Sequence, residues 1–360
     1  MILPTSYLAA LLLVLAAAVC WGTWPNTFLK TRKWRFELYS LDFALGAMLA
    51  ATALVLTIGS LGTELTFQDN LLISGKRVLA MAFVAGGVFN LGNMLFLGSL
   101  SVGGMSVAFW IAAGSALVFN LALSTIFQPQ GACAWLIGGA ILLAGSVAAM
   151  SMAFKGQAAL KDEERKKNWQ SKTRQPPRTG MKAVGLALAS GLFLAASYPL
   201  ILLSVAGSPH LRPFLSSWQG GELGLRAYTT GFLFVLGLFL STPILALVFM
   251  NVPVKGKPIG ITNYFQGNLA EHLMGLAGGA LFSAGLMAYF GGTAAHDEPL
   301  LQRGMASALG HLGLLIGVLW GLLYWKEFAG ATGQTKRFLR IGLVLLVTGL
   351  GALSVGRLAG

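Results

Sequence analysis

Two short stretches of this 360-residue chain occur twice. Residues 104–108 read Gly-Met-Ser-Val-Ala, and residues 304–308 read Gly-Met-Ala-Ser-Ala. Residues 137–145 read Ile-Gly-Gly-Ala-Ile-Leu-Leu-Ala-Gly, and residues 341–349 read Ile-Gly-Leu-Val-Leu-Leu-Val-Thr-Gly. The copies keep their order and are 200 and 204 residues apart, which argues against a chance match in Gly- and Leu-rich sequence. Each copy lies in a long apolar run, so the sequence predicts a membrane chain built from two similar halves.

The composition places the chain in a bilayer. It is 56% hydrophobic and 10% charged, whereas soluble domains carry about 25% charged residues. A spanning helix needs about 20 apolar residues. Ten such runs occur, which predicts an all-α membrane protein with ten transmembrane helices. The runs lie near 6–27, 42–62, 76–98, 103–126, 132–154, 181–205, 226–250, 269–291, 302–325 and 338–357.

Five helices in each half is an odd number, so similar halves must enter the membrane from opposite sides. We therefore expect a 5+5 inverted repeat, with residues 1–154 and 181–360 as the halves and residues 155–180 as the linker. This arrangement is typical of secondary transporters that work by alternating access, with the solute site near the bilayer midplane. The expected partners are a small-molecule solute, protons and the lipid bilayer.

The positive charge is distributed by topology. Of the 25 Lys and Arg residues, 19 fall in the loops after the odd-numbered runs. Positively charged loops remain in the cytoplasm. We therefore expect a multi-pass protein of the inner (cell) membrane, with both termini outside and the central linker in the cytoplasm. The net charge of +13 is thus explained without a nucleic-acid partner.

Several motifs resemble a known transporter family. Residues 21–27 read Trp-Gly-Thr-Trp-Pro-Asn-Thr, residues 32–38 read Arg-Lys-Trp-Arg-Phe-Glu-Leu, and Asp42 opens the second run. These residues, with residues 90–95 and 103–109, resemble the plant ureide permeases and their bacterial relatives in the drug/metabolite transporter superfamily. Residues 319–328 are similar to the end of the ninth helix in the related glucose/ribose transporter group.

The resemblance implies import of a ureide or nucleobase-like heterocycle, such as allantoin or uracil, with proton coupling. A sugar of the glucose, ribose or rhamnose type is the alternative solute. Plant members carry a nucleotide-binding-like motif in the central loop, but residues 155–182 contain no Gly-x-x-x-x-Gly-Lys pattern. No cofactor is therefore expected.

Polar residues inside the apolar runs are the candidate site, because they are costly in a bilayer. Asn90 and Asn93 share one helical face, and Asn120 lies in the next run. Paired amides would suit a ureide or a sugar, while the alternative is that they bond neighbouring helices. His311 is a candidate for the solute path, or it donates to a backbone carbonyl.

Charged residues near the ends of the runs are candidates for proton coupling or gating. Glu271 and His272 open the eighth run, where Glu271 could instead complement the helix N-terminus. Glu37 and Asp42 lie beside several basic residues and are expected to form an ion-pair network of an inner gate, or to be solvated at the interface.

Tryptophans complete the candidate site. Trp21, Trp110 and Trp320 could stack on a planar solute, whereas interfacial anchoring is the alternative. A membrane enzyme is the competing class, and its only cluster of catalytic residue types is at residues 296–298, His-Asp-Glu. An acidic helix start explains that cluster better. The sequence shows neither a metal motif nor the residue ring of a channel, so we expect a transporter and not an enzyme.

Overall fold

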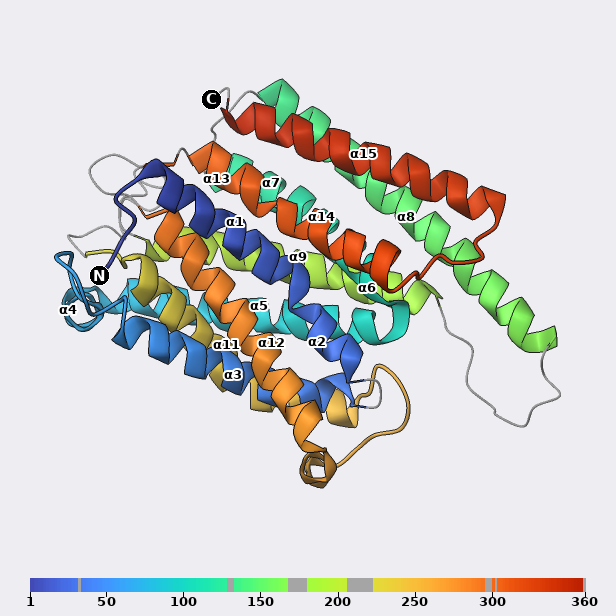
Figure 1. Cartoon of the computed structure of the whole chain (residues 1–360), viewed down its shortest axis with the longest axis horizontal. Helices are drawn as coiled ribbons and strands as arrows, with labels where there is room; N and C mark the ends of the chain where they lie inside the picture. The colour runs from blue at the N-terminus through green and yellow to red at the C-terminus, as the bar shows by residue number, and fades with distance from the viewer. Residues whose placement is uncertain are drawn as a thin grey trace.

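The computed structural model describes residues 1–31, 34–127, 133–167, 180–205, 223–294, 300–301 and 303–358. These residues form a bundle of long helices that run alongside one another (Figure 1). The two termini lie at the same end, and helix α8 projects from the opposite end (Figure 1).

Ten helices of the described chain are long and apolar enough to cross a membrane. They coincide with the ten apolar runs, so the prediction of an all-α membrane protein is confirmed. In chain order, spans one to ten are Tyr7–Lys30, Phe36–Leu56, Lys76–Gly103, Met105–Leu123, Ala134–Lys161, Met181–Ser204, Ala227–Asn251, Leu269–Gly292, Met305–Tyr324 and Gly333–Gly356.

The helical elements subdivide some of these spans. They are α1 (Tyr7–Thr23), α2 (Pro25–Lys30), α3 (Phe36–Leu56), α4 (Phe67–Ile73), α5 (Lys76–Gly103), α6 (Met105–Ala108), η1 (Phe109–Ala113), α7 (Gly114–Phe127), α8 (Cys133–Lys167), α9 (Gly180–Ser204), α11 (Ala227–Asn251), η3 (Ile261–Gln266), α12 (Leu269–Gly292), α13 (Arg303–Gly310), α14 (Leu312–Leu319), η4 (Trp320–Tyr324) and α15 (Gly333–Leu358).

Three of the differences from the sequence prediction bear on the candidate site and the linker. Span two begins at Phe36, so Asp42 lies inside α3 instead of opening it. Span nine is interrupted at His311, between α13 and α14. Helix α8 continues to Lys167, so the first part of the expected linker is helical, while residues 168–179 lie outside the described residues.

The spans pack in a regular scheme. Span one lies on span eight, and span three lies on span six. Span two packs on span eight, and span three on span seven. Span four contacts span six, and span nine contacts span one, while spans five and ten pack along each other. Spans two and seven also contact each other.

Two of these contacts bring backbones together at glycines. In the α3–α12 seam, a Cβ atom on Gly46 would overlap the Leu276 carbonyl, and one on Gly279 would overlap the Phe43 carbonyl. Small residues permit such close approach of membrane helices, where helix association depends on packing and hydrogen bonds.

The α5–α11 seam repeats this arrangement. A Cβ atom on Gly86 would overlap the Phe234 carbonyl, and one on Gly237 would overlap the Phe83 carbonyl. In both seams each helix contributes one glycine. The glycine of the partner helix lies against the backbone of the residue three positions before it. The two seams are therefore built on the same pair of reciprocal contacts.

Candidate functional site

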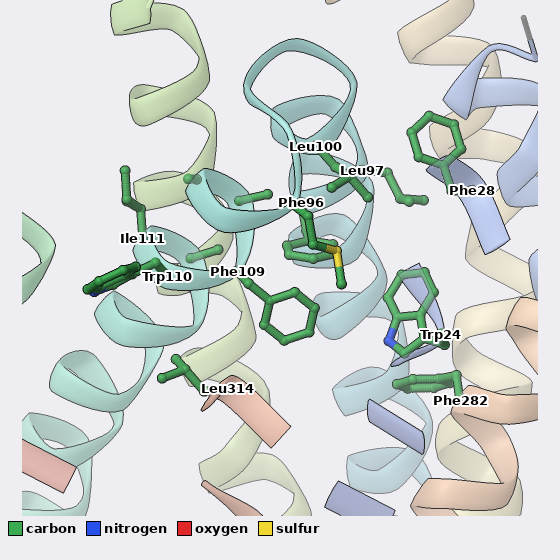
Figure 2. Close-up of a cluster of buried hydrophobic side chains, with 14 of the residues drawn as sticks. Trp24, Phe28, Phe96, Leu97, Leu100, Phe109, Trp110, Ile111, Phe282 and Leu314 are labelled. Carbon is green, nitrogen blue, oxygen red and sulfur yellow. The ribbon is translucent and has the colours of Figure 1, made fainter. Parts of the chain in front are cut away.

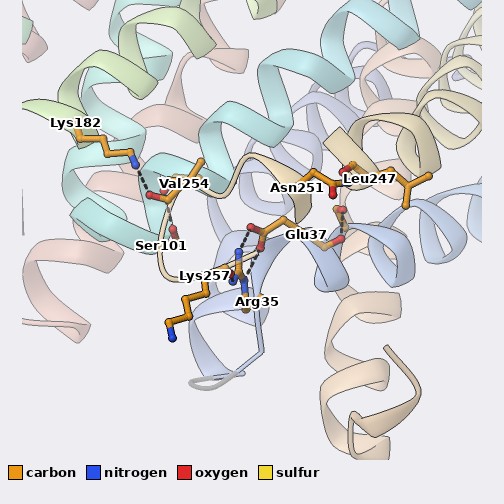
Figure 3. A network of polar contacts seen from close by, with 10 residues as sticks. Arg35, Glu37, Ser101, Lys182, Leu247, Asn251, Val254 and Lys257 are labelled. Atoms are coloured by element: carbon orange, nitrogen blue, oxygen red, sulfur yellow. Dashed lines mark hydrogen bonds and ion pairs between the residues drawn. The ribbon is translucent and has the colours of Figure 1, made fainter. Parts of the chain in front are cut away.

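Several polar contacts gather at one end of the bundle, which we call the basic end because Arg35, Lys182, Lys257 and Lys326 lie there. Arg35 precedes α3 and forms an ion pair with the fully buried Glu37, with Nη2 2.5 Å from Oε1. The same guanidinium donates to the Lys257 carbonyl at 2.6 Å (Figure 3). Glu37 thus takes part in an ion pair that ties span two to the loop after α11.

That loop is also held from span six. The Lys182 ammonium donates to the Val254 carbonyl (Figure 3), and Val254 packs beside Gly98 of α5 and the ring of Phe36. The loop joining spans seven and eight is therefore held by residues from both halves of the chain.

A second polar cluster joins spans two and eight. Asp42 is buried in α3, and its Oδ2 lies 2.9 Å from Nδ1 of His272 in α12. The Tyr264 hydroxyl, from η3, donates to Asp42 Oδ1 at 2.5 Å. Asp42 is thus paired with two residues that are more than 200 positions away in the chain.

The environment of this cluster is aromatic. Burial raises the pKa of Tyr264 above its ordinary value, and the hydrogen bond to the Asp42 carboxylate raises it further. The rings of Trp34 and Tyr264 lie edge-on to the imidazole of His272, with centroids 5.2 and 4.8 Å away. Because the His272 side chain remains 23% exposed, this is a group that solvent protons can reach.

Glu271 does not join this cluster. It forms a capping box with Asn268, in which Asn268 Oδ1 accepts from the Glu271 N–H and Glu271 Oε2 accepts from the Asn268 N–H. Both are the usual partners of a helix start. Its position is that of a residue that stabilises the N-terminus of α12.

Glu327 is a functional candidate that our sequence analysis did not single out. It follows η4, and its carboxylate accepts from the backbone N–H of Met105 at 2.5 Å and of Ser106 at 2.7 Å. Burial raises the pKa of the Glu327 carboxyl. These hydrogen bonds and the positive charge of Lys161 lower it, but the effect of burial is larger. The sequence signals were an acidic residue at the end of an apolar run and its place in the motif at residues 319–328.

The asparagines have different environments. The Asn90 amide of α5 lies 2.9 Å from the hydroxyls of Ser241 and Thr242 of α11 and 3.1 Å from a backbone carbonyl. Asn90 therefore bonds two helices. In contrast, Asn93 Nδ2 and Asn120 Oδ1 are buried atoms that find no hydrogen-bond partner among the described residues.

The motif at residues 21–27 connects spans one and nine. Trp320 Nε1 lies 3.3 Å from the hydroxyl of Thr23, and Trp325 Nε1 donates to Asn26 Oδ1 at 2.7 Å. Trp21 packs on Tyr289 with ring centroids 5.2 Å apart, and its own N–H is buried without a partner. Trp21 and Trp320 thus belong to one region around the end of span one.

An aromatic cluster lies beside this motif. The indole of Trp24 is close to the rings of Phe43, Phe96 and Phe282, with centroid distances of 4.7, 5.8 and 6.3 Å. These rings come from spans one, two, three and eight, and Figure 2 shows Trp24 directly above Phe282. The cluster fills the contact between the two halves.

Trp110 lies apart from the Trp24 cluster (Figure 2). Its ring is fully buried, and Nε1 donates to the Ser146 hydroxyl at 2.7 Å, which donates onward to the Gly342 carbonyl at 2.7 Å. This is the geometry of a residue that joins spans four, five and ten. His311 lies at the break between α13 and α14, away from the Asp42 cluster.

The structure gives one observation on metal binding for the part of the chain that it describes. Within it, no group of three His, Cys, Asp or Glu side chains is placed to hold a metal ion. The His-Asp-Glu sequence at residues 296–298 lies outside the described residues.

Comparison with known proteins shows the fold and no family. No protein-family model matches the chain, and no curated protein is similar to it. One solved structure, described only as "Crystal structure of protein", is similar over 98% of this chain and 99% of its own, with a TM-score of 0.51 and 17% sequence identity. The chain is thus a helical membrane protein whose whole length shares a known fold.

Proposed function

We propose that this protein is a secondary active transporter whose two five-helix halves, residues 1–154 and 181–360, form an inverted repeat and move a small polar solute by alternating access. The observation that carries the proposal is the pairing of the spans. If each span is exchanged with the one five places away, every main contact maps onto another main contact. The span one–eight contact becomes six–three, two–eight becomes seven–three, and four–six becomes nine–one.

The glycine contacts support the same exchange. Phe43-Ala-Leu-Gly46 in span two corresponds to Phe234-Val-Leu-Gly237 in span seven, 191 residues later. Their partners Gly86 and Gly279 are 193 residues apart. Each glycine makes the contact that its counterpart makes in the other seam, which is what a duplicated and inverted unit would produce.

Irregular helix segments also correspond. When the motifs at 104–108 and 304–308 are aligned, η1 of span four (residues 109–113) corresponds in sequence to residues 309–313 of span nine. That second segment contains the interruption at His311. Interrupted helices at matching positions of two halves are a mark of transporter folds, and π-helical turns occur frequently at functional sites.

The unpaired polar atoms support a polar solute. Leaving a buried donor or acceptor unpaired costs about 1–3 kcal/mol, and Trp21 Nε1, Asn93 Nδ2 and Asn120 Oδ1 are all in that condition. Amide and indole groups would bind a ureide or nucleobase-like heterocycle, and the Asp42–His272 pair, whose imidazole is partly exposed to solvent, would couple transport to protons. Sugar transport within the same fold is the alternative.

Transport by purified protein in proteoliposomes tests the proposal. We expect saturable counterflow of labelled allantoin or uracil, and competition by unlabelled allantoin, uracil, glucose and rhamnose would identify the solute class. Protein-free liposomes are the control. Flux that does not saturate would indicate a channel, and conversion of the solute to a new product would indicate an enzyme; either result contradicts the proposal.

A further inference from the structure

The contact of Glu327 with the start of α6 joins spans four and nine. Both carboxylate oxygens are used, one on the Met105 N–H and one on the Ser106 N–H. Gly104, with φ +91°, precedes them, and a Cβ atom there would lie 2.5 Å from Glu327 Oε1. Since glycine alone adopts this backbone freely and leaves this space, the turn between α5 and α6 is shaped around the carboxylate.

The two spans are also in close contact at two glycines that precede Glu327. Gly321 of η4 lies against Ser106, where a Cβ atom would overlap the hydroxyl and the backbone, and Gly317 lies against the ring of Phe109. Their main contacts are those of α6 and η1 with α14 and η4. All of these belong to the basic end.

The other end of span nine has a different neighbour. Met305 Sδ lies 3.0 Å from the Tyr7 hydroxyl, and Ala306 packs with Ala10 and Val14 of α1. Among the described residues, α13 has its main contacts with α1 and α15. Spans four and nine therefore meet at the basic end and diverge toward the termini.

The Glu327 contact is suited to breaking and re-forming. Charge-assisted hydrogen bonds to backbone N–H groups are stronger than neutral ones. Removing a carboxylate from water offsets much of that gain, and burial accordingly raises the pKa of Glu327. The preceding residue, Lys326, has φ +48°, an uncommon backbone conformation for a non-glycine residue. Such a contact changes state at a smaller free-energy cost than apolar packing of similar extent.

We propose that Glu327 is the latch of a gate at the basic end, where its carboxylate on the Met105 and Ser106 N–H groups holds spans four and nine together until the solute path opens to that side. The inference rests on the proposed transport function and adds the residue that closes one side. The Gln157 amide nitrogen and the Lys161 ammonium of α8 lie 3.5 and 3.2 Å from the Glu327 backbone carbonyl. These contacts do not involve the carboxylate, so span five would still hold the Glu327 backbone after the carboxylate separates from α6.

Distance measurements between spin labels test the latch directly. Labels are placed on cysteines introduced at Ser101, before the α5–α6 turn, and at Ala329, after Glu327, with Cys20 and Cys133 replaced by Ala. We expect one short, narrow distance population in the parent and a longer population in Glu327→Ala. Loss of two charge-assisted hydrogen bonds should lower the closed-to-open ratio about tenfold or more. Glu163→Ala, an exposed carboxylate on α8, is the matched control and should leave the distances unchanged.

A second variant opens the same contact without touching the carboxylate. Gly321→Ala introduces a methyl group against Ser106, whereas Gly185→Ala has no atom within 4 Å of the new Cβ. We expect the longer distance in Gly321→Ala alone. Unchanged distances in a folded Glu327→Ala variant would overturn the latch. If Glu327→Ala does not fold, unchanged distances in Gly321→Ala would overturn it.

Counterflow measured on the same samples separates the two proposals. If the distances lengthen and no solute shows counterflow in the parent, Glu327 holds spans four and nine together, but the transport function falls and the gate falls with it. If counterflow is saturable in the parent and the variants keep parental distances and rates, the transport function stands and the latch falls. We expect both to hold, with slower counterflow in Glu327→Ala than in Glu163→Ala.

Discussion

The α3–α12 and α5–α11 seams have the same backbone contacts and different polar groups. Both are closed by reciprocal glycines on partner carbonyls. The α5–α11 seam is crossed by Asn90, which bonds to three acceptors of α11. The α3–α12 seam has no such amide and carries the Asp42–His272 ion pair at the basic end.

The positions equivalent to the ion pair are apolar. Adding 191 to Asp42 gives Leu233, and subtracting 193 from His272 gives Leu79. Leu233 and Leu79 belong to one apolar cluster with Ala82 and Leu225. Close packing is thus shared by both seams, while the chemistry that could respond to pH or to gating is confined to one. If the protein transports as we propose, this difference predicts that its two ends open by different means.

The largest expected effect comes from filling the glycine contacts. Gly86→Ala and Gly279→Ala each place a Cβ atom onto a carbonyl oxygen of the partner helix, so the helices must separate. We expect each to lower the free energy of unfolding by about 3 kcal/mol, the upper part of the range for overpacking. Thermal unfolding of the detergent-solubilised protein, followed by tryptophan fluorescence, measures this.

The control is Gly138→Ala, a helical position with no atom within 4 Å of the new Cβ. It should be neutral or slightly stabilising, since alanine favours helix more than glycine does. If Gly86→Ala is severe and Gly279→Ala is neutral, the two seams are not equivalent and the comparison fails.

The second expected effect is loss of the ion pair. Asp42→Asn removes a buried charge that pairs with His272 and accepts from Tyr264. We expect destabilisation of about 2 kcal/mol, with part of it recovered when His272→Gln is added, because neighbouring residues couple. Counterflow should fall in either single variant.

Glu271→Gln is the matched control, next to His272 and outside the ion pair. Its side chain caps α12, so we expect a loss of less than about 1 kcal/mol. Additive effects of Asp42→Asn and His272→Gln would show that the two side chains do not form a functional pair.

The sequence predicted the spans well because hydrophobic length alone determines them. It missed the start of span two because Glu37 and Asp42 look like surface residues. In the structure both are buried, since Arg35 pairs with Glu37 and His272 with Asp42. Partners such as His272 and Tyr264, more than 200 residues from Asp42, are set by tertiary packing and leave no local pattern.

The candidate site was predicted in part for the same reason. Asp42 and His272 were both expected near one interface, but their pairing was not. Glu327 was missed because its partners are backbone N–H groups, which no side-chain motif reveals. The sequence analysis also overlooked the match between Phe43–Gly46 and Phe234–Gly237. The match is short, but it is strengthened by the structure, in which the two glycines make the same contact.

A smaller effect is expected from the amide of the α5–α11 seam. Asn90→Ala removes hydrogen bonds to Ser241 and Thr242. Hydrogen bonds between membrane helices contribute about 0.6 kcal/mol on average and about 1.7 at most, so we expect a loss in that range. Chemical unfolding in mixed micelles measures it.

Ser283→Ala is the corresponding change in the α3–α12 seam, four residues after Gly279 as Asn90 is after Gly86. Among the described residues the buried Ser283 hydroxyl has no hydrogen-bond partner, so its loss should be neutral or stabilising. A larger loss of stability in Ser283→Ala than in Asn90→Ala would show that the hydrogen-bonding side chain lies in the α3–α12 seam and not in the α5–α11 seam.

The smallest expected effect is a salt dependence confined to the α3–α12 seam. Salt screens the attraction between charges that solvent can reach, and the His272 side chain of the Asp42–His272 pair is 23% exposed. We therefore expect the salt-dependent part of this contact to be less than about 1 kcal/mol. The difference in unfolding temperature between low and high salt should be smaller in Asp42→Asn than in the parent, and unchanged in Asn90→Ala. An equal loss of salt dependence in both variants would mean that the responsible charges lie elsewhere and that the two seams do not differ in this respect.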